Sequence, residues 1–489
     1  MNPCLREDTF DGRRSTGQGY PVRCKLLFTV LKGQVREEMT IDIRKKPDSI
    51  AAVTVIAAFL LTAGIRAYGA QTVDPEQASA MKPAQIMEEA LSEAGKSLDE
   101  QTHVIAEQVT REAMDPEGKD KFITASGKVL RRTDGKWIFP EEGPASDDEV
   151  TIVFTGDIIF DTRQNPWSSI AYSEGIEACF DDETWDTLTG ADFLVVNNEF
   201  PYTDGGTPTP GKTFTFRCPP ETASWIGEMG TDIAALANNH IYDYGWEGAM
   251  DTFDTLDEEG IPYIGAGRDL DDAEQTAYCI ANGVTIAILN ATEIERYENP
   301  DTKGAGEDSP GVFRCLDDSR LCEKISEAKE KADLCIAFVH WGTEKMPSAD
   351  WSQMSKAQDL ADAGADLIVG AHPHVLQNIE YVDGVPVFYS LGNYFFGAAA
   401  RDTGVLRVTI DTGEPDPEEI DAEGSDGEGS GSEGPDGDKP FISSLQFIPM
   451  LQYRGVSTVD GWEKERVLDE MRAVSPGVCI DEDGFFTEE

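Results

Sequence analysis

The sequence predicts an α/β fold for its central and C-terminal parts, and two observations support that prediction. Short apolar runs alternate with stretches of helical spacing, which is the pattern of strands connected by helices. Four of the five histidines lie in three short blocks, and each block directly follows an apolar run. Residues at the carboxyl ends of strands in such a sheet gather at one edge, where binding sites form. Together these observations predict a sheet with a metal site at its edge.

The predicted elements follow one another in a regular order. Eight short apolar runs predict strands at 150–155, 193–196, 233–236, 262–264, 285–289, 334–339, 367–369 and 385–389. Apolar residues at helical spacing predict helices over 246–259, 319–331 and 351–363. Two further runs, 404–410 and 441–449, are expected to complete a sheet. We therefore place the main domain at 149–455 and a C-terminal extension at 456–489.

An acidic segment separates the last two predicted strands. Residues 411–438 contain twelve acids, no base and seven glycines. Such a composition buries too little apolar surface to offset the entropy of ordering, which predicts a disordered insert over 411–439. Calcium binding is the alternative, but the Asp-x-Asp-x-Asp-Gly spacing of a calcium loop is missing from this segment.

The N-terminal part has the character of an export segment. An apolar run over 50–65 follows Arg44, Lys45 and Lys46 and precedes small residues, which resembles a signal peptide or signal-anchor within residues 1–70. The run is short for a spanning helix, which needs about 20 residues. We expect Met39 to be the true start, since a signal of ordinary shape would begin there. The catalytic body is then extracytoplasmic, and it is either secreted or anchored by this single segment.

Residues 71–148 are predicted to form a helical stalk and linker. The first part, 71–114, is rich in Ala, Glu and Gln and spaces its apolar residues helically. A polar stretch with Pro140 and Pro144 leads from it into the main domain.

Composition restricts the partners and the chemistry. A formal net charge of −52 argues against nucleic acid, whose phosphates such a surface repels. The nine cysteines include no C-x-x-C pair, which argues against a structural zinc cluster. Cys315 and Cys322 are close enough in sequence to form a disulfide if the protein is exported.

Polar residues with metal-binding groups follow five of the predicted strands. In chain order they are Asp157 and Asp161; Glu199; Asn239, His240 and Asp243; His340 and Glu344; His372 and His374. A mixture of carboxylate, amide and imidazole groups suits Mn, Zn or Fe(II) better than it suits calcium or magnesium. In a strand, alternate residues face the same side, so both histidines of a His-x-His pair can face one pocket. Two imidazoles and a shared carboxylate are able to hold two ions about 3.5–4 Å apart.

The order of these motifs resembles the calcineurin-like metallophosphoesterase superfamily, and more closely its CapA branch of bacterial capsule or poly-γ-glutamate synthesis proteins. The motifs that carry the resemblance span residues 150–400. They are Gly156-Asp157, Asn198-Glu199, Lys212-x-Phe214-x-Phe216-Arg217-x-Pro219-Pro220, Asn238-Asn239-His240 with Asp243 and Gly245, His340-Trp341-Gly342-x-Glu344, Gly370-Ala371-His372-Pro373-His374-Val375 and Ser390-Leu391-Gly392-Asn393. The resemblance implies a four-layer αββα sandwich of the metallophosphoesterase type and one or two divalent metal ions.

The resemblance also implies roles for individual residues. Glu199 stands where the superfamily has the aspartate that bridges two metals. The second metal's ligands are matched by Asn239, His340 and His372, and the first metal's ligands by Asp157 and His374. His240, oriented by Asp243, matches the histidine that stabilises or protonates the leaving oxygen.

The chain departs from the family pattern at one ligand. The superfamily's opening Asp-x-His is here Asp157-Ile158-Ile159, so one ligand of the first metal is missing. Asp161 and Glu344 are the candidates to replace it. We favour Glu344, because Gly342 permits a sharp turn that brings a carboxylate back over the site.

Two functions compete at this stage. The first is an exported metal-dependent phosphoesterase-like protein that acts in capsule or poly-γ-glutamate synthesis or export. The second is a non-catalytic component that binds or transports an envelope polymer, with a vestigial metal site. Lys212 and Arg217 are candidates for gripping an anionic substrate, although they also fit an ordinary surface pair. The expected partners are an anionic envelope polymer or phosphoester substrate and other proteins of a capsule synthesis complex.

Overall fold

The structure is a computed structural model that describes residues 149–282, 284–294, 302–412 and 440–489. Before them it describes the backbone of five short strands: β1 (Arg23–Leu27), β2 (Glu38–Asp42), β3 (Lys121–Thr124), β4 (Arg131–Thr133) and β5 (Lys136–Ile138). The chain divides into two units, Met1–Glu107 and Gln108–Glu489. The predicted export segment at 50–65, the helical part of the stalk at 71–114 and nearly all of the acidic insert lie outside the described residues.

The short N-terminal strands form hairpins or join the main domain. In the first unit β1 pairs antiparallel with β2, so that Met39 lies opposite Leu26. In the second unit β4 pairs antiparallel with β5, and β3 pairs with a strand of the main domain. The range predicted as a polar linker therefore contains three strands.

One large sheet contains seven strands in the order β16-β17-β15-β14-β12-β11-β3. Their bounds are β11 (Ala277–Ala281), β12 (Val284–Thr292), β14 (Leu334–His340), β15 (Leu367–Ala371), β16 (Ile379–Val382) and β17 (Val385–Phe388). The four central strands β12, β14, β15 and β17 run parallel. Their carboxyl ends therefore meet at one edge, where His340 is the last residue of β14.

The second sheet contains eight strands. Seven follow the order β21-β20-β19-β6-β7-β8-β9, and β18 pairs with β6 beside this path. The bounds are β6 (Glu149–Ile158), β7 (Phe193–Asn198), β8 (Ile233–Ala235), β9 (Tyr263–Ile264), β18 (Asn393–Phe395), β19 (Arg401–Asp411), β20 (Phe441–Gln452) and β21 (Val456–Thr458). Strands β6 to β9 run parallel, and β19 pairs antiparallel with β6.

The two sheets pack face to face, and alternate residues of each strand divide between two apolar layers. Phe154 of β6 and Phe338 of β14 meet between the sheets with ring centroids 5.6 Å apart. The neighbouring residues Val153 and Val339 face outward, toward the helices. This alternation is what a strand with period two produces when both of its faces are buried.

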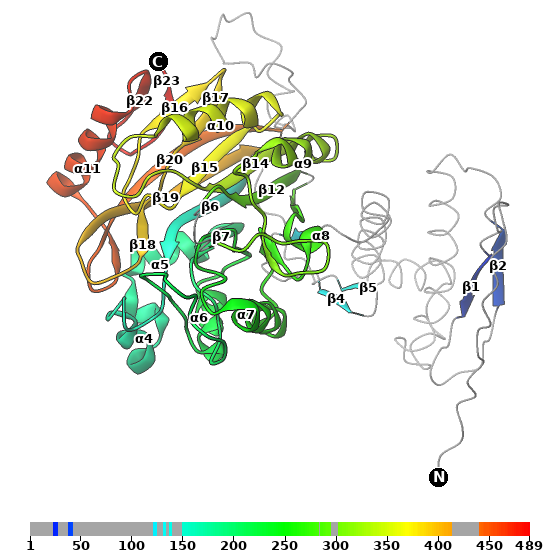
Figure 1. The fold of residues 1–489 in the computed structure, drawn as a ribbon. Coiled ribbons are helices and arrows are strands. Elements are labelled where there is room, and N and C mark those ends of the chain that lie inside the picture. The colour runs from blue at the N-terminus through cyan, green and yellow to red at the C-terminus, as the bar shows by residue number, and fades with distance from the viewer. Residues whose placement is uncertain are drawn as a thin grey trace, which may run out of the picture. The chain divides into compact units, whose positions relative to one another are not determined.

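Helices cover the outer face of each sheet (Figure 1). Helices α4 (Ser168–Glu174), α5 (Asp182–Thr189), α6 (Ala223–Glu228) and α7 (Gly245–Glu259) lie against the eight-stranded sheet. Helices α9 (Ser319–Lys329) and α10 (Trp351–Asp362) lie against the seven-stranded sheet. The predicted αββα sandwich is therefore confirmed. Smaller elements are η1 (Ile176–Cys179), η2 (Pro220–Thr222), β10 (Ala266–Gly267), α8 (Leu270–Ala273) and β13 (Gly311–Val312).

Capping residues set the ends of the main helices. Asp350 accepts hydrogen bonds from the first turn of α10 while the Gln353 side chain accepts one from the Asp350 backbone, which forms a capping box. Helix α7 ends at Gly260, whose φ of 75° is the left-handed conformation that glycine adopts without strain. These local signals agree with the predicted helix positions at 246–259 and 351–363.

The C-terminal residues belong to the same core. Helix α11 (Gly461–Val474) and strands β22 (Val478–Ile480) and β23 (Phe486–Glu488) follow β21. Buried side chains from them, Val467, Leu468, Met471, Ile480 and Phe486, join the apolar layer between the two sheets. Residues 456–489 thus pack onto the domain rather than extending from it.

Two further findings bear on the sequence predictions. Among the residues that the structure describes, no helix is both long enough and apolar enough to cross a membrane. Cys315 and Cys322 are free thiols, so the suggested disulfide between them is not formed.

Candidate metal centre

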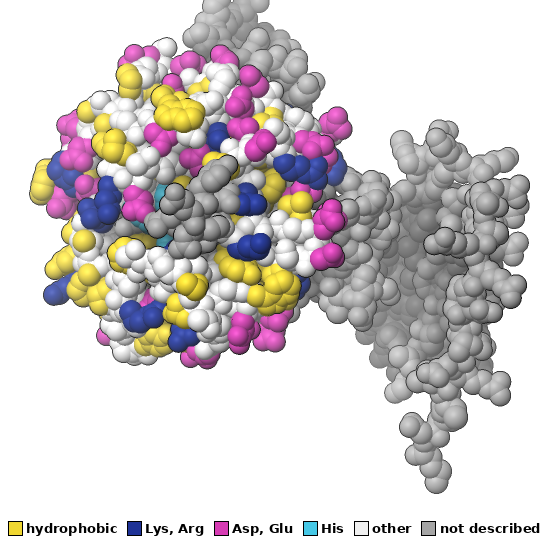
Figure 2. All heavy atoms as spheres, in the orientation of Figure 1, with side chains coloured by type: hydrophobic (Ala, Val, Ile, Leu, Met, Phe, Trp, Pro, Cys, Tyr) yellow, Lys and Arg dark blue, Asp and Glu magenta, His cyan; other side chains and the backbone are white. Residues whose placement is uncertain are grey.

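The predicted metal-binding side chains converge where strand ends of the two sheets face each other. From the eight-stranded sheet come residues at or just after the ends of β6, β7 and β8: Asp157, Glu199, Asn239 and His240. From the seven-stranded sheet come His340 at the end of β14 and His372 and His374 just after β15. Figure 2 shows histidine reaching the surface at one place, with Lys and Arg side chains on several sides of it.

Four of these residues form a first group, which we call the His340 cluster: Asn239, His340, His372 and Glu199. The Nε2 atom of His340 lies 3.0 Å from Asn239 Oδ1, 3.1 Å from His372 Nδ1 and 3.6 Å from Glu199 Oε1. Burial lowers the pKa of both His340 and His372 well below the ordinary value, so both rings are neutral at pH 7. Neutral imidazoles offer the lone pairs that metal ions require.

The carboxylate of Glu199 provides the test of whether a metal ion fits this group. Glu199 is fully buried, and neither of its oxygens has a hydrogen-bond partner among the described residues. Burial, and next the charge of Asp157, raise its pKa well above the ordinary value. A buried carboxylate without a partner costs several kcal/mol, and a bound cation would offset that cost. Ligand atoms of Glu199, His372 and His374 also lie within 4.8 Å of one another. The residues present therefore fit a divalent ion.

A second group, the His374 cluster, consists of Asp157, His374 and Asn393. The Nδ1 atom of His374 lies 2.9 Å from Asp157 Oδ2 and 2.8 Å from Asn393 Oδ1. Burial lowers the pKa of His374, but hydrogen bonding to Asp157 and its charge outweigh burial and raise the pKa overall. The other oxygen of Asp157 accepts hydrogen bonds from Asn197 Nδ2 at 2.7 Å and from His372 N at 3.2 Å.

The turn after β15 directs the two histidines of the His-x-His motif to different clusters. Strand β15 ends at Ala371, so the alternation expected from a strand does not apply to His372 and His374. Both adopt positive φ, 99° at His372 and 59° at His374, which non-glycine residues rarely do. Such backbone strain is found where surrounding structure holds a functional group in place.

His240 lies beside the His340 cluster and is held from behind. Its Nδ1 is 2.7 Å from Asp243 Oδ2, and its Nε2 is 3.9 Å from Glu199 Oε1. Its ring stacks on Phe216 with centroids 4.0 Å apart. Burial lowers the pKa of His240. The geometry leaves Nε2 directed toward the centre while Asp243 fixes the ring.

Lys212 lies behind His240 and Asp243, and its side chain is too buried to contact a substrate. Its side chain is only 4% exposed, and its Nζ donates to Asp243 Oδ1 at 2.5 Å and to the Asn239 carbonyl oxygen. Asp243 also accepts from the backbone N of Phe216 at 2.6 Å. The residue predicted to grip a substrate therefore holds the loop that carries Asn239 and His240.

Arg217, the second predicted substrate residue, is bound to its own surroundings. Its backbone N donates to Asp161 Oδ2 at 3.2 Å, and its guanidinium donates to the Asp204 and Gly205 carbonyl oxygens. The guanidinium also lies 4.6 Å from the centre of the Tyr244 ring. The Arg217 guanidinium, which was expected to bind an anion, thus already interacts with two backbone oxygens and an aromatic face.

The two residues considered as replacements for the missing histidine lie in different environments. Asp161 is buried, and its carboxylate is bound by the guanidinium of Arg163, with Nε at 2.9 Å. Glu344 lies on the surface with 49% of its side chain exposed, 3.9 Å from the Lys345 amine. Its charge contributes to raising the pKa of His374, which places it near the centre without making it part of either cluster.

Two residues of the candidate centre were given no role by the sequence analysis. Asn393 was noted as part of the Ser390-Leu391-Gly392-Asn393 motif but given no role, and it is a member of the His374 cluster. Asn197 bonds Asp157 and lies 3.4 Å from His340 Nδ1, so it links the two clusters. A signal for Asn197 was present, because it is an amide side chain at a strand end two residues before Glu199. Asn393 lies 19 residues from His374 in sequence, so only its motif marked it.

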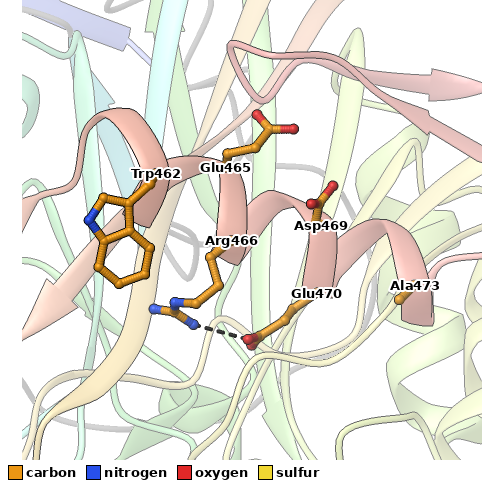
Figure 3. Close-up of a pocket in the computed structure, with 6 residues that line it drawn as sticks. All are labelled: Trp462, Glu465, Arg466, Asp469, Glu470 and Ala473. Atoms are coloured by element: carbon orange, nitrogen blue, oxygen red, sulfur yellow. Dashed lines mark hydrogen bonds and ion pairs between the residues drawn. The ribbon is translucent and has the colours of Figure 1, made fainter.

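The surface has a concavity beside the candidate metal centre and another on α11. A groove of about 420 Å³ begins at His374 and runs to α11, with Leu376, Arg401 and Met471 among its lining residues. A second hollow of about 490 Å³ lies on the outer side of α11, between Trp462 and Ala473. Figure 3 shows that Arg466 bonds Glu470 in this second hollow, and none of the predicted metal ligands lines it.

Fold and site together define a four-layer α/β sandwich with a candidate two-metal centre between its facing strand ends. The family model described as "Bacterial capsule synthesis protein PGA_cap" matches residues 151–398, which is half of the chain. The chain therefore belongs to this family, and the resemblance identified from the motifs is confirmed.

Curated relatives agree with this assignment. The PGA biosynthesis protein CapA of Bacillus subtilis is 33% identical over 54% of this chain and 67% of its own length. The capsule biosynthesis protein CapA of Bacillus anthracis is 39% identical over 36% of this chain, and the match spans only 43% of that relative.

Two solved structures show weaker similarity. A hypothetical protein from Thermus thermophilus is 17% identical over 53% of this chain and 93% of its own, with a TM-score of 0.33. A 5'-nucleotidase from Candida albicans is 13% identical over 54% of this chain and 52% of its own, with a TM-score of 0.30.

Proposed function

We propose that this protein is a metal-dependent phosphoesterase-like hydrolase that acts in capsule or poly-γ-glutamate synthesis or export at the cell envelope. The observation that carries the proposal is the fully buried carboxylate of Glu199, which has no hydrogen-bond partner among the described residues and faces neutral imidazoles and an amide oxygen. A group that only stabilised the fold would be paired. Family membership and the names of the Bacillus relatives support the role in capsule synthesis.

The residues of the two clusters would hold the ions. Asn239, His340 and His372 would bind one ion, Asp157 and His374 would bind the other, and Glu199 would lie between them. Divalent ions in such a pair neutralise charge on a phosphoryl group and activate water for attack. The mixture of oxygen and nitrogen ligands favours Mn, Zn or Fe(II).

His240 would stabilise or protonate the leaving group. Its Nδ1 is bound to Asp243, so its Nε2 is the atom available to hydrogen-bond or protonate a leaving oxygen. Lys212 holds Asp243 and the Asn239 carbonyl together, which keeps the imidazole and the neighbouring amide ligand in register. The chain therefore supplies a fixed donor beside the place where a phosphoryl group would bind.

Arg401 would bind a distant anionic group of the substrate. It is exposed, it lines the groove that begins at His374, and its side chain has no hydrogen bond or ion pair with another described residue. Asp402 and Glu470 in the same groove are already paired with Arg466. An anionic polymer approaching a chain with net charge −52 needs such a local cation.

The alternative is a non-catalytic polymer-binding or transport component of the envelope. One observation favours it: Ile159 stands where the superfamily has a metal-binding histidine, and it is buried in apolar packing. A centre that holds one ion weakly would bind a polymer without cleaving it.

Metal analysis and a hydrolysis screen separate these functions. We would purify the full chain, determine bound metals by mass spectrometry, and assay p-nitrophenyl phosphate and bis(p-nitrophenyl) phosphate with Mn, Zn or Fe(II). Metal-dependent hydrolysis that Glu199→Gln abolishes would support the proposed function. Bound metal without hydrolysis of any phosphoester would support the alternative, and absence of bound metal under all conditions would contradict the hydrolase.

A further inference from the structure

One metal-binding position is left open by the sequence, because Ile159 replaces the expected histidine beside Asp157. We propose that the side-chain oxygen of Asn393 is the missing ligand of the ion in the His374 cluster. This inference rests on the proposed metal centre. It adds a ligand from a different part of the chain.

Strand pairing brings Asn393 to the ion position. Strand β18 pairs with β6 so that Asn393 lies opposite Asp157. The backbone N of Asp157 donates to the Gly392 carbonyl at 2.9 Å. A Cβ on Gly156 would lie 2.0 Å from that same carbonyl oxygen, so only glycine fits there. The Gly156-Asp157 motif and the Gly392-Asn393 motif therefore pack directly against each other.

The amide of Asn393 is oriented with its oxygen toward the cluster. Its Nδ2 donates to the Phe396 carbonyl at 3.4 Å, which leaves Oδ1 facing His374 Nδ1 at 2.8 Å. Asp157 Oδ2 lies 2.9 Å from the same nitrogen. Neighbouring ligands of an ion at about 2.1 Å stand about 3 Å apart, so both separations from His374 Nδ1 fit atoms that share one ion. Asn239 offers the same amide chemistry in the other cluster.

The carboxylates that compete for this role have other surroundings. Asp161 is bound by Arg163 through both of its oxygens, and binding an ion would require it to give up that pair. Glu344 is half exposed and belongs to neither cluster. Asn393 is 8% exposed, and its Oδ1 already lies 2.8 Å from His374 Nδ1.

Metal titration of the full chain tests the proposal without an activity assay. We would titrate metal-free protein with Mn²⁺ by calorimetry and measure bound metal after dialysis. Asn393→Ala should weaken one of two binding steps at least tenfold and leave the other within twofold. Asn393→Asp should restore the weakened step, because a carboxylate oxygen replaces the amide oxygen.

A matched control separates ligation from a structural role. Asn165 is fully buried and its Nδ2 donates to the Phe395 carbonyl, so it supports the same strand without reaching the cluster. Asn165→Ala should keep both binding steps. Two unchanged steps in Asn393→Ala, or equal weakening in Asn165→Ala, would overturn the assignment of Asn393 alone. A wild-type chain that binds no Mn²⁺, Zn²⁺ or Fe²⁺ would overturn the proposed metal-dependent function together with it.

Discussion

At the scale of single residues, the centre depends on groups that are costly to bury without an ion. Glu199 is the clearest case, since it is fully buried and neither oxygen is hydrogen-bonded among the described residues. Glu199→Gln removes the charge and nearly preserves the shape. We expect the metal-free variant to melt at a higher temperature than metal-free wild type, and the rise in Tm on adding Mn²⁺ to disappear.

Thermal melting in EDTA and in Mn²⁺ measures both effects. Glu323→Gln is the control, because this acid of α9 is 57% exposed, pairs with Arg320 and belongs to neither cluster, so its substitution should change neither value. A Mn²⁺-dependent rise in Tm that persists in Glu199→Gln would mean that Glu199 does not bind the ion.

His372 carries the firmest expectation for metal content. Its Nδ1 lies 3.1 Å from His340 Nε2, and two neutral imidazoles at that distance need either a shared proton or a shared ion. His372→Ala should lower bound metal by at least one ion per chain and abolish metal-dependent hydrolysis. If mass spectrometry finds the same number of bound metal ions per chain in His372→Ala, the His340 cluster is excluded as a metal site.

Asp232 gives a pH-dependent prediction away from the centre. Burial raises its pKa from 3.8 to about 7, against the hydrogen bond that its Oδ2 accepts from Leu194 N at 2.8 Å. Because the folded pKa lies above the unfolded one, stability is full below about pH 4 and falls as the pH rises to 7. Asp232→Asn keeps the acceptor and removes this loss. It should be more stable than wild type at pH 8 by roughly 2–4 kcal/mol, at about 1.4 kcal/mol per pKa unit.

Urea unfolding at pH 8 and at pH 5 compares the two proteins. The advantage of Asp232→Asn should shrink markedly at pH 5, where wild type is largely protonated. The same advantage at both values would show that packing, rather than ionisation, causes it.

The sequence predicted which residues reach the centre better than it predicted what holds them. The topology of parallel strands brings together six predicted ligands that lie at or just after strand ends. They are Asp157, Glu199, Asn239, His340, His372 and His374. Lys212 was assigned to a substrate because a motif does not reveal that Asp243 and the Asn239 carbonyl surround its amine. Partners from distant loops depend on tertiary packing, which spacing along the chain does not encode.

At the scale of elements, strand pairing explains how the acidic insert is accommodated. Strands β19 and β20 pair along their length, and the last pair is Asp411 with Phe441. The insert therefore connects two strand ends that pairing already holds together. Deleting 413–438 and joining the ends with a short glycine-containing turn should change Tm by no more than a few degrees, because loop-closure cost varies slowly with length.

Melting and metal content of this deletion variant are the measurements. A larger loss of Tm, or loss of bound metal, would show that the insert contributes to the folded domain.

Element prediction succeeded where apolar runs were buried on both faces. Strands β6, β7, β12, β14 and β15 all lie within two residues of the predicted starts. Strand β11 was missed, although Asn282 and Gly283 between two apolar runs are a hairpin signal, and β11 pairs antiparallel with β12. Helix α11 was missed because its apolar face is narrow, and its burial depends on a core built from both sheets.

At the scale of the whole molecule, net charge influences the affinity for an anionic partner. The net charge of −52 repels such a partner, so affinity should depend on the exposed guanidinium of Arg401 in the groove at His374. Arg401→Gln should weaken binding of a γ-linked glutamate oligomer about tenfold. Arg407→Gln is a matched control from the same strand, six residues further along and about 20 Å away at 3.3 Å per residue.

Calorimetric titration of metal-loaded protein with the oligomer measures this affinity. Equal weakening by both variants would indicate a general charge effect, and no weakening by Arg401→Gln would exclude the groove as the polymer site.

The residues of each cluster come from both sheets, and this origin would determine when the chain acquires the proposed ions. The His340 cluster needs residues from 199 to 372, and the His374 cluster needs residues from 157 to 393. Neither cluster exists until both sheets have formed and packed, so loading of the proposed ions would be a late event in folding. A chain that crosses a membrane unfolded takes its ions from the compartment in which it folds. The ion recovered from native protein would then record the metal supply of that compartment as much as the preference of the ligands.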